Sequence, residues 1–115
     1  VSGGITHMKK ICALAEAHHQ GIIPHAVPSG PVATAAHVQL GCAVPNWEVQ
    51  EHRPQETGAW PDIVDRVIKL DHGYLIAPEG PGLGIALTDA GFKKRPPRSR
   101  LGETATRADG SVAFR

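Results

Sequence analysis

The chain has 115 residues, of which 41% are hydrophobic and only 4% aromatic, and its formal net charge is +1. This length and composition fit one small domain whose core is built from Val, Ile, Leu and Ala. Because acidic and basic residues are interspersed, no nucleic-acid partner is expected. No apolar stretch approaches the roughly 20 residues of a membrane span, and we expect neither a signal peptide nor a membrane partner.

The first predicted element is a helix that is capped by Thr6 and runs to about residue 19. Its apolar stripe at helical spacing consists of Met8, Ile11, Cys12 and Ala15. A short apolar strand over residues 21–25 follows and ends at His25. Cys12 and Cys42 are expected to be buried free thiols rather than a disulfide or a metal pair, which favours a cytoplasmic protein.

A second helix is predicted over residues 32–44, and Pro31 suits its first turn because the missing N–H would be unpaired there anyway. A second strand over residues 47–51 ends at Glu51. Strand, helix and strand in this order indicate an α/β fold with a right-handed parallel crossover. The carboxyl ends of the strands carry the active sites of α/β barrels, so we expect His25 and Glu51 to face one pocket.

The pattern changes after Glu51, where residues 53–61 read as a polar loop. The remaining pieces are a short helix or strand over 62–68, strand-like pieces over 69–76 and 83–87, and a tail with little regular structure from Lys93 onward. The basic residues at the start of this tail are expected to be solvated rather than to bind phosphate: Lys93, Lys94, Arg95, Arg98 and Arg100.

Eight short motifs occur in order along the chain: Gly3-Gly4-Ile5-Thr6, Lys9-Lys10-Ile11, Pro24-His25, Gly30-Pro31-Val32-Ala33, Pro45-Asn46, Gln50-Glu51, Gly73-Tyr74-Leu75 and Pro81-Gly82-Leu83-Gly84. Each motif alone is unspecific, but the ordered set resembles the C-terminal part of the enolase superfamily, mandelate racemase subgroup. The sugar-acid dehydratases that act on galactonate and mannonate are the most similar members. The resemblance covers most of the chain and fades after about Phe92.

This resemblance implies the C-terminal fragment of a modified (β/α) TIM-type barrel, followed by a segment that returns to a capping domain. Residues 1–68 would form the last strands and helices of the barrel, residues 69–92 would be strands returning to the capping domain, and residues 93–115 an irregular C-terminal tail. The implied reaction is that of a Mg²⁺-dependent, galactonate-like sugar-acid dehydratase. It removes the proton alpha to a carboxylate and eliminates water to leave a 2-keto-3-deoxy acid.

The acidic Mg²⁺ ligands of the family lie on earlier barrel strands, upstream of this sequence. The chain starts at Val1 without an initiator Met, so we expect a fragment of a longer protein that is inactive alone. By resemblance the parent is a homo-oligomer with a small sugar acid as substrate. Three alternatives stay open: mannonate or another acid sugar as substrate, a racemase, and a non-catalytic truncated remnant.

By resemblance His25 is the acid/base of the reaction and also contacts the substrate. Glu51 is the second catalytic and substrate-binding residue, a glutamate on the final barrel strand that hydrogen-bonds to the substrate or to its metal-bound carboxylate region. The bland alternatives are a structural histidine at a strand end and a surface carboxylate paired with Arg53. Period-2 alternation would place Glu51 on the face of Trp47 and Val49. The loop from His25 to Gly30, one residue longer than the family pattern, is the expected substrate-lining loop. The other histidines lack metal-ligand spacing: His7, His18, His19, His37, His52 and His72.

Overall fold

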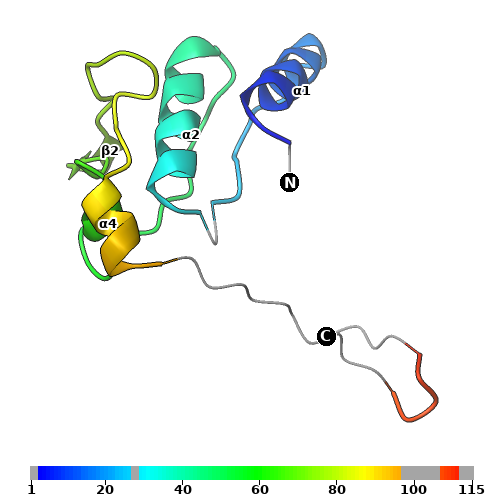
Figure 1. The fold of residues 1–115 in the computed structure, drawn as a ribbon. Coiled ribbons are helices and arrows are strands. Elements are labelled where there is room, and N and C mark those ends of the chain that lie inside the picture. The colour runs from blue at the N-terminus through cyan, green and yellow to red at the C-terminus, as the bar shows by residue number, and fades with distance from the viewer. Residues whose placement is uncertain (1–2, 27–28, 97–106, 112–115) are drawn as a thin grey trace.

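The computed structural model describes residues 3–26, 29–96 and 107–111. Its two long elements are the helices α1 (Ile5–Ala17) and α2 (Pro31–Ala43). Figure 1 shows α2 in the centre, with α1 on one side and the shorter elements on the other. Those shorter elements are α3 (Trp60–Ile63), β1 (Leu70–Asp71), β2 (Tyr74–Leu75) and α4 (Asp89–Lys94). No helix in the described ranges has the length and apolar character needed to cross a membrane.

Helix α1 confirms the first predicted helix but not its cap. The N-cap is Gly4, with a φ of 103°, and no side chain accepts a hydrogen bond from the first turn, so the expectation for Thr6 is wrong. A positive φ is cheap for glycine, which explains why the turn falls there. On the predicted apolar stripe Met8 and Cys12 are buried, while the side chain of Ile11 remains 45% exposed.

The two predicted strands on either side of α2 pair in parallel, as expected, but only through one bridge, between Ile22 and Trp47. The Ile22 amide donates to the Asn46 carbonyl at 2.8 Å, and the Glu48 amide donates to the Ile22 carbonyl at 3.0 Å. The ladder cannot continue in regular form at Pro24, which has no N–H to donate. The parallel crossover is therefore present, and its strands are far shorter than the sequence pattern predicts.

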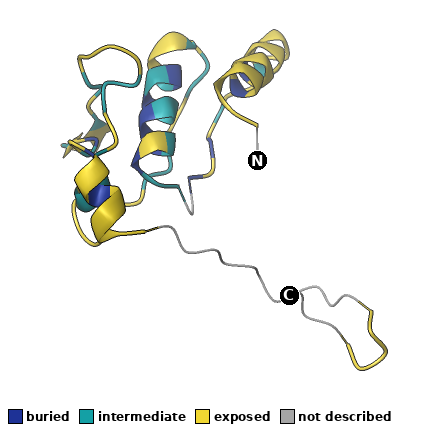
Figure 2. Cartoon of the chain, viewed as in Figure 1, coloured by how far each residue is buried: buried dark blue, intermediate teal, exposed yellow. Residues whose placement is uncertain are grey.

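Helix α2 packs on both sides because apolar residues lie on two of its faces. One buried cluster joins its Leu40 to Met8 and Cys12 of α1, with Ile22, Val44 and Trp47 at its edge. The other joins Ala35 and Val38 to Ile68, with Leu75, Ala77, Leu83 and Ile85 at its edge. The burial pattern in Figure 2 follows this division, with buried and half-buried residues concentrated along α2. Cys42 is exposed, which contradicts the expectation that it is buried, although both thiols are free.

The region after α3 differs most from the sequence expectation. Residues 69–76 form a hairpin rather than one strand, with antiparallel pairs Leu70–Leu75 and Asp71–Tyr74. Its two-residue turn has positive φ at both His72 (48°) and Gly73 (86°), as in the tight turns that match the twist of a hairpin. The predicted strand over 83–87 is reduced to an antiparallel bridge between Leu87 and Val64.

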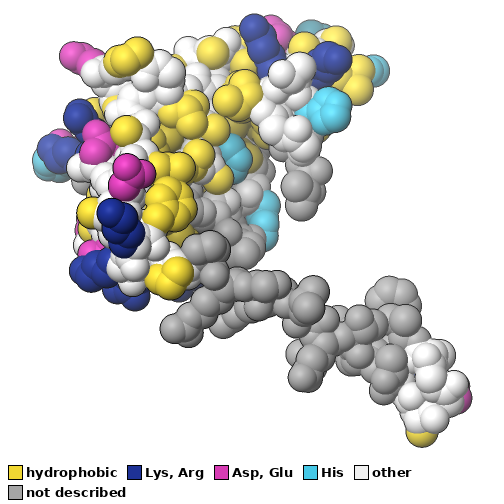
Figure 3. All heavy atoms as spheres, viewed as in Figure 1, with side chains coloured by type: hydrophobic (Ala, Val, Ile, Leu, Met, Phe, Trp, Pro, Cys, Tyr) yellow, Lys and Arg dark blue, Asp and Glu magenta, His cyan; other side chains and the backbone are white. Residues whose placement is uncertain are grey.

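Helix α4 was not expected from the sequence, and it changes the interpretation of the basic run. Lys94 and Arg95 pair with the two oxygens of Asp62, at 2.7 and 3.0 Å, so these two residues fasten α4 to α3. Their proximity lowers the pKa of Asp62 below its usual value. Figure 3 shows Lys and Arg side chains gathered around this part of the surface. Arg98 and Arg100 lie outside the described residues.

Candidate functional site

His25 and Glu51 lie together, as the parallel crossover predicts. The Nε2 atom of His25 is 3.9 Å from Oε2 of Glu51, with 78% of the histidine side chain and 40% of the glutamate side chain exposed. The same Glu51 oxygen accepts a hydrogen bond of 2.9 Å from the Ala26 amide. At 3.9 Å the contact with His25 is too long for a hydrogen bond, so the carboxylate is held mainly by the backbone next to the histidine.

The bridge between Ile22 and Trp47 sets this geometry. Both segments leave the bridge in the same direction, so His25 and Glu51 emerge at the same end. The strand alternation that was expected to place Glu51 does not apply, because regular pairing ends near Trp47 and the Val49 side chain is 59% exposed. Among the described residues the recorded ion pair of Glu51 is with His25, not with Arg53.

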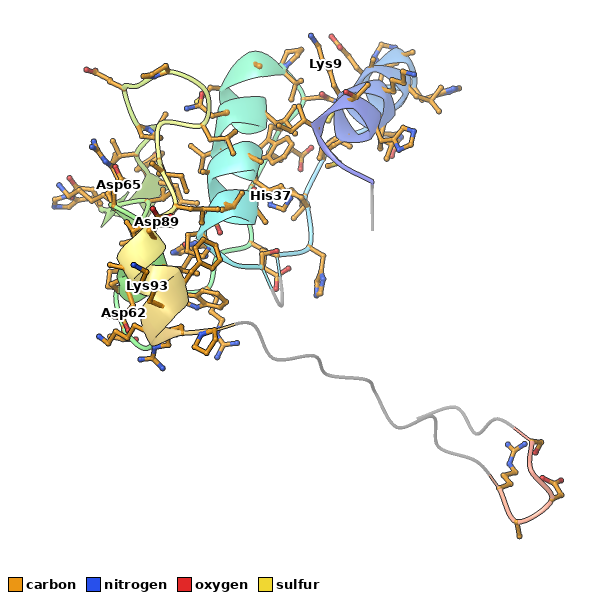
Figure 4. All side chains as sticks on the ribbon, viewed as in Figure 1. Lys9, His37, Asp62, Asp65, Asp89 and Lys93 are labelled. Carbon is orange, nitrogen blue, oxygen red and sulfur yellow. The ribbon has the colours of Figure 1, made fainter. Side chains whose placement is uncertain are left out.

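A row of side-chain contacts joins α2 to residues 47–55, the segment that contains Glu51. The Gln50 amide nitrogen donates to the Glu51 carbonyl at 2.6 Å and lies 3.3 Å from Nδ1 of His37. The rings of His37 and Trp47 pack with centroids 6.2 Å apart. Five residues beyond Gln50, the Gln55 amide donates to the Thr34 hydroxyl at 2.7 Å. Figure 4 shows His37 on α2, on the side away from Asp65 and α4.

The spacing of residues on α2 indicates these contacts in the sequence itself. Thr34, His37 and Gly41 are spaced at three and four residues, so they lie on one face of α2. A Cβ on Gly41 would come within 3.1 Å of the Trp47 ring, which shows how closely the following segment approaches that face. Polar residues at such spacing on an otherwise apolar helix indicate a polar contact with a neighbouring segment.

Burial changes the titration of two groups near this region. Desolvation lowers the pKa of His37, so its imidazole is neutral at pH 7. Desolvation likewise raises the pKa of the Cys12 thiol, which makes this cysteine a structural residue rather than a nucleophile.

Within residues 3–26, 29–96 and 107–111, no group of His, Cys, Asp or Glu side chains could hold a metal ion. A surface hollow does occur beside the bridge, lined by Glu16, His19, Gln20, Gly21, Pro45, Asn46 and Glu48. These residues precede or flank the bridge, whereas His25 and Glu51 follow it, so the hollow and the His25–Glu51 pair lie at different ends. The predicted substrate-lining loop includes positions 27 and 28, which lie outside the described residues.

Comparison with known proteins gives a consistent result. Residues 1–91 match the family described as enolase C-terminal domain-like. The chain is 36% identical, over 123 aligned positions, to D-galactonate dehydratase of Variovorax paradoxus, covering 97% of the chain and 31% of that protein. It is 34% identical over 85 residues to D-xylonate dehydratase of Haloferax volcanii, covering 74% of the chain and 20% of that protein.

The fold has relatives among solved structures. The crystal structure of mandelate racemase/muconate lactonizing enzyme from Jannaschia sp. CCS1 superposes with a TM-score of 0.74 at 37% identity, over 85% of this chain and 25% of that one. The chain thus spans about a fifth to a third of the length of the curated relatives it matches.

Proposed function

The chain belongs to the enolase C-terminal domain-like family, and from this membership we propose that it is the C-terminal part of the barrel of a sugar-acid dehydratase. The proposed substrate is an aldonate of the galactonate type, with mannonate or xylonate as the nearest alternatives. The observation that carries the proposal is the His25–Glu51 pair, at 3.9 Å, in a chain whose named relatives are dehydratases of sugar acids. The barrel assignment of residues 1–68 and the return segment 69–92 belong to the same proposal, whereas helix α4 (Asp89–Lys94) extends past Lys93, where the irregular tail was expected to begin.

The proposed reaction breaks the C–H bond beside the substrate carboxylate and the C–O bond of the neighbouring hydroxyl. A base takes the proton of the C–H bond, and the electron pair of that bond forms the new double bond. The neighbouring hydroxyl gains a proton from an acid and leaves as water. The resulting enol rearranges to a 2-keto-3-deoxy acid. An exposed imidazole such as that of His25 can reach a substrate and serve as a proton donor or acceptor.

The two residues take different roles in this scheme. His25 either protonates the leaving hydroxyl or exchanges the proton alpha to the carboxylate. Only the second role introduces solvent deuterium at the alpha carbon of the unreacted substrate. Glu51 accepts hydrogen bonds from substrate hydroxyls through Oε1, because Oε2 already accepts one from the Ala26 amide. The bond to Oε2 orients the carboxylate, and with it Oε1, before the substrate arrives.

The family resemblance also implies Mg²⁺, which would stabilise the negative charge that develops on the substrate carboxylate. The residues described here do not fit this ion, because none of their acidic or histidine side chains is grouped to bind it. We therefore place its ligands outside the described residues and assign no step through the metal to this chain.

The test is turnover by the full-length protein that carries this sequence, supplied with Mg²⁺ and a panel of aldonates that includes galactonate, mannonate and xylonate. We expect one of them to yield a 2-keto-3-deoxy acid. His25→Asn should lower the turnover number by about 10²- to 10⁴-fold, the usual contribution of a general acid or base. Glu51→Gln should raise KM, because it removes the charge while keeping the shape.

His72→Asn is the matched control, because His72 is an exposed histidine on the β1–β2 turn and asparagine tolerates its positive φ. It should leave turnover unchanged. A full-length protein that dehydrates none of these acids, or a His25→Asn variant as active as the wild type, would refute the proposal. Inversion of a substrate without loss of water would favour the racemase alternative.

A further inference from the structure

We propose that Gln50 and His37 act as a positioning pair that holds Glu51 in place for the substrate. Neither residue reaches the His25–Glu51 contact directly. The Gln50 side chain instead connects the Glu51 backbone carbonyl, at 2.6 Å, to the His37 ring, at 3.3 Å. The effect on catalysis rests on the proposed function, whereas the effect on the position of Glu51 does not.

The direction of these hydrogen bonds follows from the chemistry of the amide. The Gln50 nitrogen can only donate, so both of its partners must accept. The Glu51 carbonyl accepts by nature, and Nδ1 of His37 accepts only when the ring proton sits on Nε2. His37 must therefore be neutral, which agrees with the burial that lowers its pKa.

Helix α2 makes this a firm anchor because it is packed on both sides by the two apolar clusters. A second side-chain bond, from Gln55 to Thr34 at 2.7 Å, fastens the same segment to α2 beyond Glu51. Glu51 thus lies between two attachments to one helix. Its carboxylate contacts the other segment, where it accepts the Ala26 amide bond and lies near His25.

The other atom of the Gln50 amide points to a role beyond stability. Its Oε1 is buried and has no hydrogen-bond partner among the described residues. A buried, unpaired carbonyl oxygen destabilises the folded protein, and an apolar side chain at this position would avoid that loss. The two contacts of its amide nitrogen, with the Glu51 carbonyl and the His37 ring, give the glutamine at this position a role that a purely apolar side chain could not fill.

The test compares four variants of the full-length protein that carries this sequence. Gln50→Leu removes both donated bonds, and His37→Leu removes the acceptor. His37→Asn replaces the ring nitrogen by a carbonyl oxygen that can accept the same bond. Gln39→Leu is the matched control, because Gln39 lies on α2 and also donates to a backbone carbonyl, that of Pro78 at 3.4 Å.

We expect Gln50→Leu and His37→Leu to lower turnover by about 100-fold, the effect of a displacement near 1 Å of a substrate-positioning group. His37→Asn should restore most of the activity, and Gln39→Leu should leave it unchanged. Crystal structures should show the Glu51 carboxylate displaced from the Ala26 amide in Gln50→Leu and His37→Leu only. If activity instead follows the melting temperatures of the variants, Gln50 and His37 are merely structural and the proposal fails.

The structural arm separates this inference from the proposed function. If the wild-type protein dehydrates no aldonate, the proposed function fails, and the crystal structures still decide the positioning role. A Gln50→Leu structure in which Glu51 keeps its bond to the Ala26 amide overturns the inference whatever the enzyme does.

Discussion

The side chain of His37 is partly buried, unlike that of a fully solvated histidine. Its ring is partly buried between Trp47 and Gln50, and burial lowers its pKa below the ordinary value of about 6.5. In the unfolded chain the same residue binds its proton near pH 6.5. As the pH falls below that value, the unfolded state takes up a proton that the folded state does not, and the free energy of unfolding decreases.

We therefore expect neutral His37 to stabilise the full-length protein fully above about pH 6.5. Below that pH this stabilisation is lost progressively, and the melting temperature falls with it. The measurement is the difference in melting temperature between the wild type and His37→Asn, followed from pH 8 to pH 5. As the pH falls, the melting temperature of the wild type should decrease more than that of His37→Asn. A constant difference would show that His37 titrates normally in the folded protein.

At the level of single residues, the proximity of His25 and Glu51 could be predicted because it depends only on chain order. Two parallel segments joined by a helix must present their ends on the same side. The Gln50–His37 contact could not be predicted in that way. It depends on how α2 is rotated about its axis, and neither apolar face of α2 fixes that rotation in the sequence. In the sequence, His37 is one of seven histidines, and its spacing to Thr34 and Gly41 indicates a polar face of α2 without identifying the partner residue.

Among the elements, α4 is a short helix whose start depends on one side chain. The Thr88 hydroxyl accepts a bond of 3.1 Å from the Gly91 amide and donates one of 3.2 Å to the Asp62 carbonyl in α3. Replacing an N-cap threonine by alanine typically costs about 1 kcal/mol. We expect Thr88→Ala to exceed this value, because it also removes the contact with α3.

The check is the free energy of unfolding, or the rate of proteolysis near residues 88–95, in the full-length protein. Thr88→Ser, which keeps the hydroxyl, should stay close to the wild type, and Ala90→Ser, on an exposed position of the same helix, should change little. An unchanged proteolysis rate in Thr88→Ala would mean that the Asp62 ion pairs alone hold α4.

The long elements were predictable and the short ones were not. Helices α1 and α2 carry enough residues for periodicity, proline and glycine signals to agree, and their observed bounds differ from the expected ones by only a few residues. The strands beside them shrink to one bridge, because a local pattern of apolar residues does not reveal how far a partner extends. The β1–β2 hairpin was missed because its turn, His72-Gly73, places a histidine at positive φ, where asparagine or aspartate is the usual signal.

For the molecule as a whole, the two apolar clusters are small and many large apolar side chains remain on the surface. The exposed ones are Ile5, Ile11, Leu14, Ile23, Val32, Val49, Leu70, Tyr74, Ile76, Leu87 and Phe92. Hydrophobic side chains are visible at several places on the face shown in Figure 3. Where such side chains adjoin one another, exposed apolar surface marks either an interaction with further protein or a tendency to aggregate.

The proposed function makes the first of these explanations specific: the exposed face of α1 would be covered by the rest of the barrel. The 115-residue chain expressed alone should then associate, bind hydrophobic dyes and show no dehydratase activity. Leu14, with 66% of its surface exposed, should behave differently in the isolated chain and in the full-length protein. Leu14→Lys should make the isolated chain more soluble, because a charge replaces an exposed apolar group.

In the full-length protein the same change should lower the melting temperature, because the lysine would be buried against neighbouring barrel elements without a partner. Lys10→Gln, on an exposed position of α1, is the control and should alter neither measurement. Size-exclusion chromatography and thermal unfolding provide both readouts. A monomeric isolated chain with a sharp unfolding transition, or a full-length protein indifferent to Leu14→Lys, would mean that Leu14 lies on the solvent face of α1 in the parent as well, and the proposed covering of this face would be wrong.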